Sequence, residues 1–322
     1  MKKIIVLTSG GDAPGMNAAI RAVVRSAHYY GIQSFGSQLG FQGLVDKNLI
    51  PLQPESVANC IQHGGTILKA ERCLPFYEKS TRDECRKFLK QMEIDGIVVI
   101  GGNGSFRGGA LLEQEGGPPA IGIPGTIDND IPGTDYTIGF DTARNTALDA
   151  IDRIRDTASS HNRHFLVEVM GRTSGFLAVD VGIAGGAEVI IIPEFETPIT
   201  AIAQKLTSPK RPKSSSIIVV AEADHPGWSM QLGKELSELT KLNFRVCILG
   251  HTQRGGTPTL IDRKIASQMG FMAVTALRDG ISSKMVAMNR DQMTLEPFPD
   301  VDAPARTVID RNLLELNEVL CL

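Results

Sequence analysis

The stretch Ile-Ile-Val-Leu-Thr-Ser-Gly-Gly-Asp-Ala-Pro-Gly-Met-Asn, residues 4–17, runs from an apolar segment directly into a glycine-rich turn. Short β-branched apolar runs that alternate with helical patterns are typical of buried parallel strands. In open α/β sheets, ligands bind beyond the carboxyl ends of such strands. The sequence therefore predicts a ligand crevice at these strand ends. Six more apolar runs end on Gly, Asp, Glu, Arg or His, at residues 97–100, 121–123, 165–167, 189–192, 217–220 and 246–249.

Helical patterns separate these runs and complete a βαβ rhythm, which indicates parallel sheets with helices on both faces. A length of 322 residues suits about two domains. We expect an α/β fold with two similar Rossmann-like lobes, and a boundary near residues 137–141. Residues 193–212, rich in Pro, Thr and Ser, are expected to loop out. The expected helices cover residues 16–30, 81–92, 106–115, 141–159 and 260–278.

The composition is that of a protein with sizeable apolar cores, at 42% hydrophobic and 21% charged residues. A net charge of -3 argues against a nucleic-acid partner. No apolar stretch approaches the roughly 18 residues of a membrane helix, so no membrane partner is expected. The five cysteines are scattered without CxxC spacing, which favours free thiols in a reducing cytoplasm.

Two glycine-rich loops follow the first two apolar runs. Residues 10–17 contain one, and Gly102-Asn103-Gly104-Ser105 followed by Gly108-Gly109 repeats the design. Glycine lets backbone N–H groups approach an anion, and a helix start adds partial positive charge. Either loop alone could be a tight turn without a ligand, whereas two together suit a polyphosphate. Neither matches the Walker or GxGxxG pattern, which disfavours a P-loop ATPase and a Rossmann dehydrogenase.

Two carboxylates, Asp128 and Asp130, follow the third run within Thr126-Ile127-Asp128-Asn129-Asp130. Alternation would point both the same way, so one could accept a proton from a hydroxyl while the other orients it or holds a metal ion. The string alone would also suit an Asx turn. Next to two phosphate-type loops, we favour the catalytic interpretation.

Basic residues gather at strand ends and in loops of this acidic protein. Arginine forks match phosphate oxygens, so we interpret the group as a site for an anionic substrate. Any one of them could instead be a surface residue, and His251 could be a satisfied buried histidine. Glu222 could be a sheet-edge carboxylate or an acceptor for a sugar hydroxyl. The basic residues are Arg72, Arg163, Arg172, Arg245, His251 and Arg254.

The motifs GGDAPGMN, PGTIDND, MGR and GHTQRGG, in this order, resemble those of the bacterial ATP-dependent 6-phosphofructokinase family. The likeness covers nearly the whole chain. It implies glycolytic phosphoryl transfer from MgATP to the 1-hydroxyl of fructose 6-phosphate. It also implies an ATP-binding lobe of residues 1–138 plus about 251–300 and a fructose-6-phosphate-binding lobe of residues 139–250 plus about 301–322. A homotetramer with active sites shared between subunits completes the expectation.

The resemblance also implies residue roles. Asp128 would be the base for the sugar hydroxyl, Thr126 and Asp130 would position the sugar, and Arg172 with the Gly11 N–H would stabilise the transferring phosphoryl group. ATP-contact positions are Gly11, Arg72, Cys73, Gly102, Asn103, Gly104, Ser105 and Gly108. The sugar-phosphate pocket comprises Thr126, Ile127, Asp128, Met170, Gly171, Arg172, Glu222, His251, Thr252, Gln253 and Arg254, with Arg163 and Arg245 from a neighbouring subunit.

Gly104 and Gly125 decide the phosphoryl donor, because pyrophosphate-using relatives carry Asp and Lys at these positions. Glycine at both indicates ATP. Asn103 replaces an aspartate that commonly helps to hold Mg²⁺, so we expect weaker metal capture without loss of activity. The rivals are a pyrophosphate-dependent kinase of the same fold and a weakly active nucleotide-sensing paralogue. The sequence does not exclude tagatose 6-phosphate as acceptor.

A second basic set matches the regulatory ADP and phosphoenolpyruvate positions of the family, although Arg21 and Arg25 alone would also suit a solvated helix face. Pro54 stands where an arginine is common, and Ser214-Ser215-Ser216 replaces a basic cluster. We therefore expect a weak, altered or absent allosteric response. The effector set is Arg21, Arg25, Arg155, Gly186, Glu188, Arg211 and Lys213.

Overall fold

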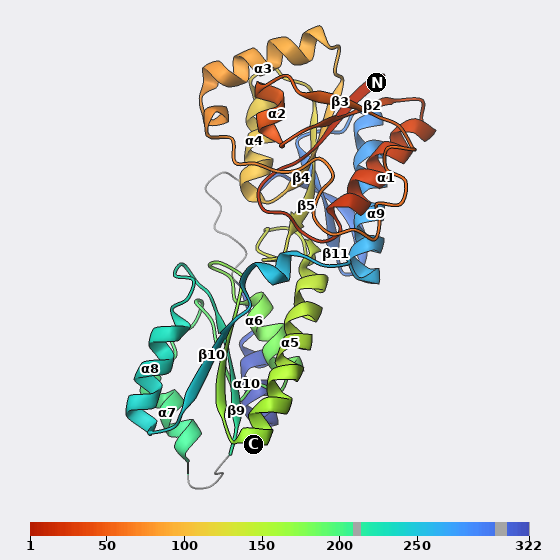
Figure 1. Cartoon of the computed structure of the whole chain (residues 1–322). Helices are drawn as coiled ribbons and strands as arrows, with labels where there is room; N and C mark the ends of the chain where they lie inside the picture. Colours follow the sequence, from red (N-terminus) through yellow and green to blue (C-terminus); the bar gives the residue numbers. More distant parts are fainter. Residues whose placement is uncertain (209–213, 300–307, 322) are drawn as a thin grey trace. The chain divides into compact units, whose positions relative to one another are not determined.

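The structure is a computed structural model that describes residues 1–208, 214–299 and 308–321 (Figure 1). The chain forms two compact units, and each is assembled from three separate segments. The first contains Met1–Ile127, Ile131–Thr142 and Arg254–Ala303. The second contains Asp128–Asp130, Ala143–Gln253 and Pro304–Leu322.

The first unit is built on a mostly parallel sheet of eight strands among its described residues, in the order β12-β11-β5-β4-β1-β2-β3 with β6 beside β5. Strands β1, β4 and β5 at its centre are runs of buried apolar residues. Their ends are aligned, because Thr8 pairs with Ile100 and Gly101 pairs with Pro124. The strands are β1 (Lys3–Thr8), β2 (Gln33–Ser37), β3 (Leu49–Leu52), β4 (Gly96–Gly101), β5 (Ala120–Thr126), β6 (Ile138–Gly139), β11 (Lys284–Asn289) and β12 (Gln292–Pro297).

Helices cover both faces of this sheet (Figure 1). On one face, α1 (Met16–Tyr29) packs against α9 (Leu260–Arg278), where a Cβ on Gly270 would lie only 2.6 Å from the Ala22 Cβ. On the other face, apolar side chains of α2 (Phe41–Val45), α3 (Lys79–Gln91) and α4 (Asn103–Gln114) share one core with the central strands. Helix η1 (Leu74–Tyr77) contributes Phe76 to that core. The sheet is thereby buried between two helical layers.

The second unit has a parallel sheet of four strands in its described part, in the order β10-β7-β9-β8. Helices α7 (Ile199–Thr207) and α8 (Ser229–Thr240) share a core with one face, while α5 (Phe140–His161), α6 (Phe176–Ala184) and α10 (Arg311–Leu320) lie on the other (Figure 1). A short helix, η2 (Gly250–Arg254), follows the last strand. The strands are β7 (His164–Val169), β8 (Val189–Ile191), β9 (Ser216–Ala221) and β10 (Phe244–Ile248).

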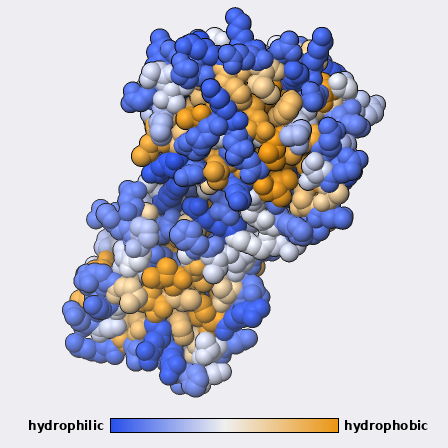
Figure 2. Space-filling model, turned by 45° about the horizontal axis from the view of Figure 1, so that its top comes forward, coloured by the Kyte–Doolittle hydropathy of each residue, from blue (hydrophilic) through white to orange (hydrophobic). Residues whose placement is uncertain are grey.

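The α/β class with mainly parallel sheets flanked by helices is confirmed. The seven predicted runs are strands, three in the first sheet and four in the second. Residues 193–212 were expected to loop out, but their described part contains α7, which starts directly after Pro198. Among the described residues, no helix is both long and apolar enough to span a membrane. Figure 2 shows a face on which hydrophilic residues surround smaller apolar patches.

Candidate active site

The two glycine-rich loops lie side by side in the first unit. The Ser9 N–H donates to the Ile100 carbonyl at 2.9 Å, and a Cβ on Gly101 would collide with the Ser9 carbonyl oxygen. A Cβ on Gly10 would lie 3.6 Å from Ser105 Oγ. The loops meet because β1 and β4 are paired neighbours whose carboxyl ends are level. The two glycine-rich loops are therefore adjacent in the first unit.

Each loop leads directly into a helix, with α1 starting at Met16 and α4 at Asn103. The first N–H groups of a helix lack intrahelical partners and attract anions. The Asn103 Oδ1 atom is buried and has no hydrogen-bond partner. Such an orphaned oxygen fits a ligand that supplies a donor or a cation. No group of three His, Cys, Asp or Glu side chains gathers for a metal ion within the described parts of the chain.

The end of β5 lies next to the second loop. A Cβ on Gly125 would lie 3.1 Å from Met16 Cε and 3.7 Å from the Gly101 nitrogen, so the strand passes close to both neighbours. The Thr126 carbonyl accepts a hydrogen bond from Thr137 Oγ1 at 2.7 Å. The short β5–β6 pairing fixes the same residue, and Thr126 therefore has a defined position at this strand end.

Arg254 rests on the first glycine loop. A Cβ on Gly11 would collide with its guanidinium nitrogen Nη1, and Arg254 Nε is buried without a hydrogen-bond partner. A larger residue at position 11 would push the guanidinium away from the loop. The family resemblance implies that Arg254 belongs to the sugar-phosphate pocket, and in the structure its guanidinium lies beside the loop at residues 10–17.

Gly108 and Phe41 form the apolar end of this region. A Cβ on Gly108 would lie 2.9 Å from Phe41 Cζ, and the Phe41 and Phe76 rings are 4.4 Å apart. Cys73 is buried in the same core, where burial raises the pKa of its thiol. Arg72, the neighbouring expected ATP contact, is exposed.

Asp128 and Arg172, two of the expected catalytic residues, face each other in the second unit. Asp128 is 5% exposed, and its Oδ2 lies 3.7 Å from Arg172 Nε, whose side chain is 60% exposed. Ser174 Oγ donates to the Asp128 carbonyl at 2.9 Å. These contacts explain why residues 128–130 group with the second unit, although we expected them in the first lobe.

Asp130 is an acid with a strongly altered affinity for protons. Burial, and then the negative charge of Asp128, raise its pKa to about 6, while Arg172 acts in the opposite direction. Two neighbouring carboxylates resist ionising together, so Asp130 keeps its proton to a higher pH than an ordinary aspartate. The pair thus consists of Asp130, whose ionisation is disfavoured, and Asp128, which faces the Arg172 guanidinium.

The residues around Arg172 give it an unusual backbone. Gly171 has φ 138° and Arg172 has φ 52°. The Glu222 carboxylate accepts the Arg172 N–H at 3.2 Å, and burial raises the pKa of Glu222. Met170 is buried at 5% exposure. The Met-Gly-Arg motif thus turns the guanidinium outward from a buried anchor.

Arg163 and Arg245 lie at the other end of the second sheet. Arg163 precedes β7, and Arg245 pairs with Phe165 near the start of that strand, whereas Arg172 follows its carboxyl end. The six residues of β7 span about 20 Å. Within the unit, these two arginines are therefore not brought to Asp128. Of the remaining expected residues, His251 and Thr252 are exposed and Gln253 is buried.

The described effector residues are divided between the two units. In the second unit, Arg155 Nη2 donates to the Gly185 carbonyl at 2.5 Å and to the Gly186 carbonyl at 2.8 Å, and Glu188 Oε2 accepts the Ile217 N–H at 2.6 Å. Arg21 and Arg25 belong to α1 of the first unit. Arg211 and Lys213 lie outside the described residues. Ser216, one of the three serines, is buried in β9 and bonded to His164.

Three buried polar side chains that hold backbone segments in place were not singled out by the sequence. Asp262 accepts the N–H groups of Gly139 and Thr142, and Glu168 accepts those of Gly227 and Ser229. Ser174 is the third. Only Asp262 had a local signal, because it stands three residues after Thr259, whose hydroxyl accepts its N–H in an N-cap.

Comparisons with known proteins give a consistent result. The family described as Phosphofructokinase matches residues 3–277. The ATP-dependent 6-phosphofructokinase of Coxiella burnetii is 57% identical over 100% of this chain and 98% of its own. The ATP-dependent 6-phosphofructokinase 1 of Thermus thermophilus is 51% identical, with 100% of both chains covered.

Solved structures share the fold. The phosphofructokinase of Pichia pastoris in the T-state matches with a TM-score of 0.87 and 35% identity over 92% of this chain. This chain spans only 35% of that longer yeast chain. A pyrophosphate-dependent phosphofructokinase from Nitrosospira multiformis matches with a TM-score of 0.86 and 21% identity, over 96% of this chain and 86% of its own.

Proposed function

Because the chain belongs to the phosphofructokinase family, we propose that it transfers the γ-phosphoryl group of MgATP to the 1-hydroxyl of D-fructose 6-phosphate. The products are fructose 1,6-bisphosphate and ADP, which makes the chain a glycolytic kinase. Curated relatives that match its whole length are named ATP-dependent 6-phosphofructokinases, which supports ATP as the donor.

The first unit supplies the donor site. The paired glycine loops and the starts of α1 and α4 present backbone N–H groups to the phosphates of ATP. The Gly11 N–H and the adjacent Arg254 guanidinium stabilise negative charge on the transferring group. Adenine binds toward Phe41, Cys73 and Gly108, where the surroundings are apolar.

The second unit supplies the base. Asp128 accepts the proton of the sugar 1-hydroxyl, and Arg172 neutralises charge on the phosphoryl group as the new bond forms. Asp130, with its raised pKa, orients the sugar together with Thr126. Glu222, Met170 and Gly171 contact the sugar phosphate around Arg172.

Magnesium fits this donor set. Mg²⁺ takes few protein ligands and is completed by water and substrate phosphates. The orphaned Asn103 Oδ1 would hold it directly or through water. When bound, Mg²⁺ neutralises charge on the β- and γ-phosphates.

ATP is favoured over pyrophosphate by the two glycines of the second loop and β5. Nothing lies within 4 Å of a Cβ on Gly104, so this position leaves open space for a nucleotide phosphate. At Gly125 a Cβ would press on Met16 and Ile100, which gives that glycine a packing reason as well.

We further infer a cytoplasmic homotetramer whose subunits share active sites. Arg163 and Arg245 would complete the sugar-phosphate pocket of a neighbouring subunit, since they lie remote from Arg172 on β7 of their own unit. An apolar stripe on α10 supports association, because its exposed members are three and four residues apart on one helix face. The stripe comprises Leu313, Leu316 and Leu320.

The effector residues form a proposed regulatory site with reduced charge. Pro54 and the buried Ser216 supply no cation, so phosphoenolpyruvate and ADP are expected to alter the rate weakly or not at all. Saturation curves for fructose 6-phosphate with and without each effector test this expectation. A strong shift of the curve by either compound would contradict it.

The facing pair Asp128 and Arg172 is the observation that carries the proposal. It is tested by assaying purified protein with Mg²⁺, with ATP or pyrophosphate as donor and fructose 6-phosphate or tagatose 6-phosphate as acceptor. We expect turnover with ATP and fructose 6-phosphate, and a loss of at least about 1,000-fold in Asp128→Ala. Near-wild-type turnover of that variant would refute the base assignment. Negligible turnover of the parent protein would favour a nucleotide sensor.

A further inference from the structure

We propose that Ser174 is a positioning residue whose hydroxyl holds the Asp128 segment opposite Arg172. The inference rests on the proposed roles of Asp128 and Arg172. Ser174 is fully buried at 0% exposure, and its Oγ donates to the Asp128 carbonyl at 2.9 Å. The bond joins residues 46 positions apart in the chain, so it ties two distant segments together.

Ser174 belongs to the same tight turn as Arg172. The Ser174 N–H donates to the Gly171 carbonyl at 2.9 Å and closes the turn. Arg172 adopts φ 52°, a left-handed conformation that a non-glycine residue keeps only when its surroundings enforce it. A Cβ on Gly171 would collide with the Ser174 carbonyl oxygen. The guanidinium and the hydroxyl are therefore carried by one compact element.

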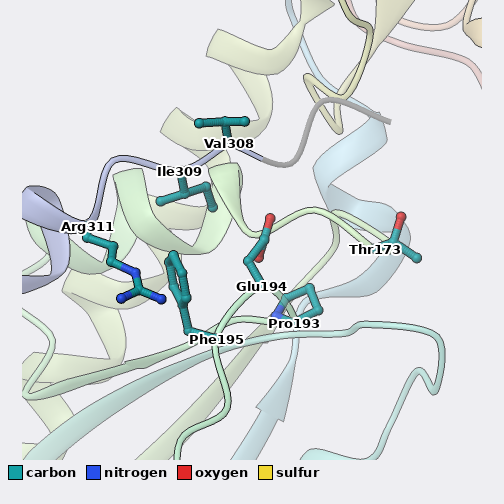
Figure 3. Close-up of a pocket in the computed structure, with 7 residues that line it drawn as sticks. All are labelled: Thr173, Pro193, Glu194, Phe195, Val308, Ile309 and Arg311. Atoms are coloured by element: carbon teal, nitrogen blue, oxygen red, sulfur yellow. The ribbon is translucent and has the colours of Figure 1, made fainter. Parts of the chain in front are cut away.

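Two carboxylates fix this turn from the neighbouring strands. Glu222, after β9, accepts the Arg172 N–H at 3.2 Å. Glu194, after β8, accepts the Gly175 N–H at 2.8 Å. Figure 3 shows Glu194 and Thr173 on the wall of a pocket of about 570 Å³ beside the turn. Because Arg172 and Gly175 are both hydrogen-bonded to residues that follow the strands, the turn is a stable support for the Asp128 segment that Ser174 binds.

The segment held by Ser174 needs such a support. The chain bends sharply after Asp128, because Asn129 has φ 52°. The hydroxyl bond engages the carbonyl at the start of this bend and so restricts rotation of the Asp128 peptide. Loss of the bond lets the carboxylate drift from Arg172 Nε, which lies 3.7 Å away. A misplacement of about 1 Å in a catalytic group costs about 100-fold in rate.

The test compares Ser174→Ala with a matched control. Ser237 Oγ also donates to a backbone carbonyl, that of Gly233 at 2.8 Å, in α8 of the same unit. We expect kcat of Ser174→Ala to fall at least about 10-fold, with KM for ATP within about twofold of wild type. Ser237→Ala is expected to keep the wild-type kcat. Thermal unfolding of each variant measures any loss of folded protein.

A second substitution separates hydrogen bonding from packing. In Ser174→Cys the thiol is a weak donor of similar size, so positioning predicts a kcat between those of Ser174→Ala and the parent. A wild-type kcat in both Ser174 variants would overturn the proposal, as would an equal fall in Ser237→Ala. Asp128→Asn identifies the other failure: if that variant is active, the proposed base is wrong, whatever Ser174 does.

Discussion

Replacing Asp130 with Asn is expected to stabilise the protein at pH 8 while weakening its activity. Burial and the charge of Asp128 raise the Asp130 pKa from 3.8 to about 6. A carboxyl group with a raised pKa stabilises the folded state below its unfolded pKa, and this contribution is lost as the pH rises through the folded value. Wild-type protein therefore loses stability as Asp130 ionises, whereas the Asn variant does not.

The magnitude follows from the two pKa values. At 1.36 kcal/mol per pH unit, the interval from 3.8 to about 6 corresponds to about 3 kcal/mol, of which about 2 kcal/mol is lost between about pH 4.5 and about pH 8. The free energy of unfolding of Asp130→Asn, relative to wild type, should thus rise by about 2 kcal/mol across this range.

Urea unfolding at both pH values, at one fixed protein concentration, measures the effect. Asp152→Asn is a suitable control, because Asp152 is an exposed carboxylate on α5. Its difference from wild type is expected to stay within about 0.5 kcal/mol at either pH. If the Asp130→Asn difference is the same at both pH values, the reasoning from burial and paired charge is refuted.

Three further predictions test the loops and the core. A Cβ at Gly104 meets nothing within 4 Å, so the free energy of unfolding of Gly104→Asp should stay within about 0.5 kcal/mol of wild type, while kcat/KM for ATP falls about 100-fold. Unchanged ATP kinetics in a coupled assay would contradict this prediction. Asn103→Asp adds negative charge at the orphaned oxygen, so a Mg²⁺ titration should reach the half-maximal rate at an about 10-fold lower Mg²⁺ concentration. A higher Mg²⁺ concentration at the half-maximal rate would disprove the metal assignment. Glu168→Leu leaves the N–H groups of Gly227 and Ser229 without an acceptor, and urea unfolding should show a free energy of unfolding lower by about 2 to 3 kcal/mol. Glu168→Gln keeps an acceptor, so its free energy of unfolding should fall by less.

The sequence indicated most of the central strands because each is a compact apolar run before a polar or glycine ending. It missed β3 and β12 because edge strands carry weaker patterns, such as Pro51 within the four residues of β3. It missed β11 as well, a strand whose apolar run of four residues includes Met285, Ala287 and Met288, which are not β-branched. The pattern of apolar residues therefore predicts the buried strands better than the strands at the edges of the sheet.

The candidate site divides in a similar way. The position of both glycine loops at the carboxyl ends of strands was predictable, because each loop follows an apolar run. The pairing of β1 with β4, which brings Gly10 and Gly101 together, skips β2 and β3 in the chain. The contact of Arg254 with Gly11 and the bond from Ser174 to Asp128 join distant parts of the chain. No spacing rule describes such contacts, and only the folded coordinates reveal them.

The interleaved chain path of the two units has a consequence for synthesis on the ribosome. Strand β5 pairs with β11, whose residues are made more than a hundred positions later. Until then the nascent polypeptide presents an open edge, which is a template for intermolecular pairing. Chains truncated before β11 should accordingly be insoluble or chaperone-bound. Neither of the two units can be expressed from one contiguous stretch of the gene, because each consists of three separate segments.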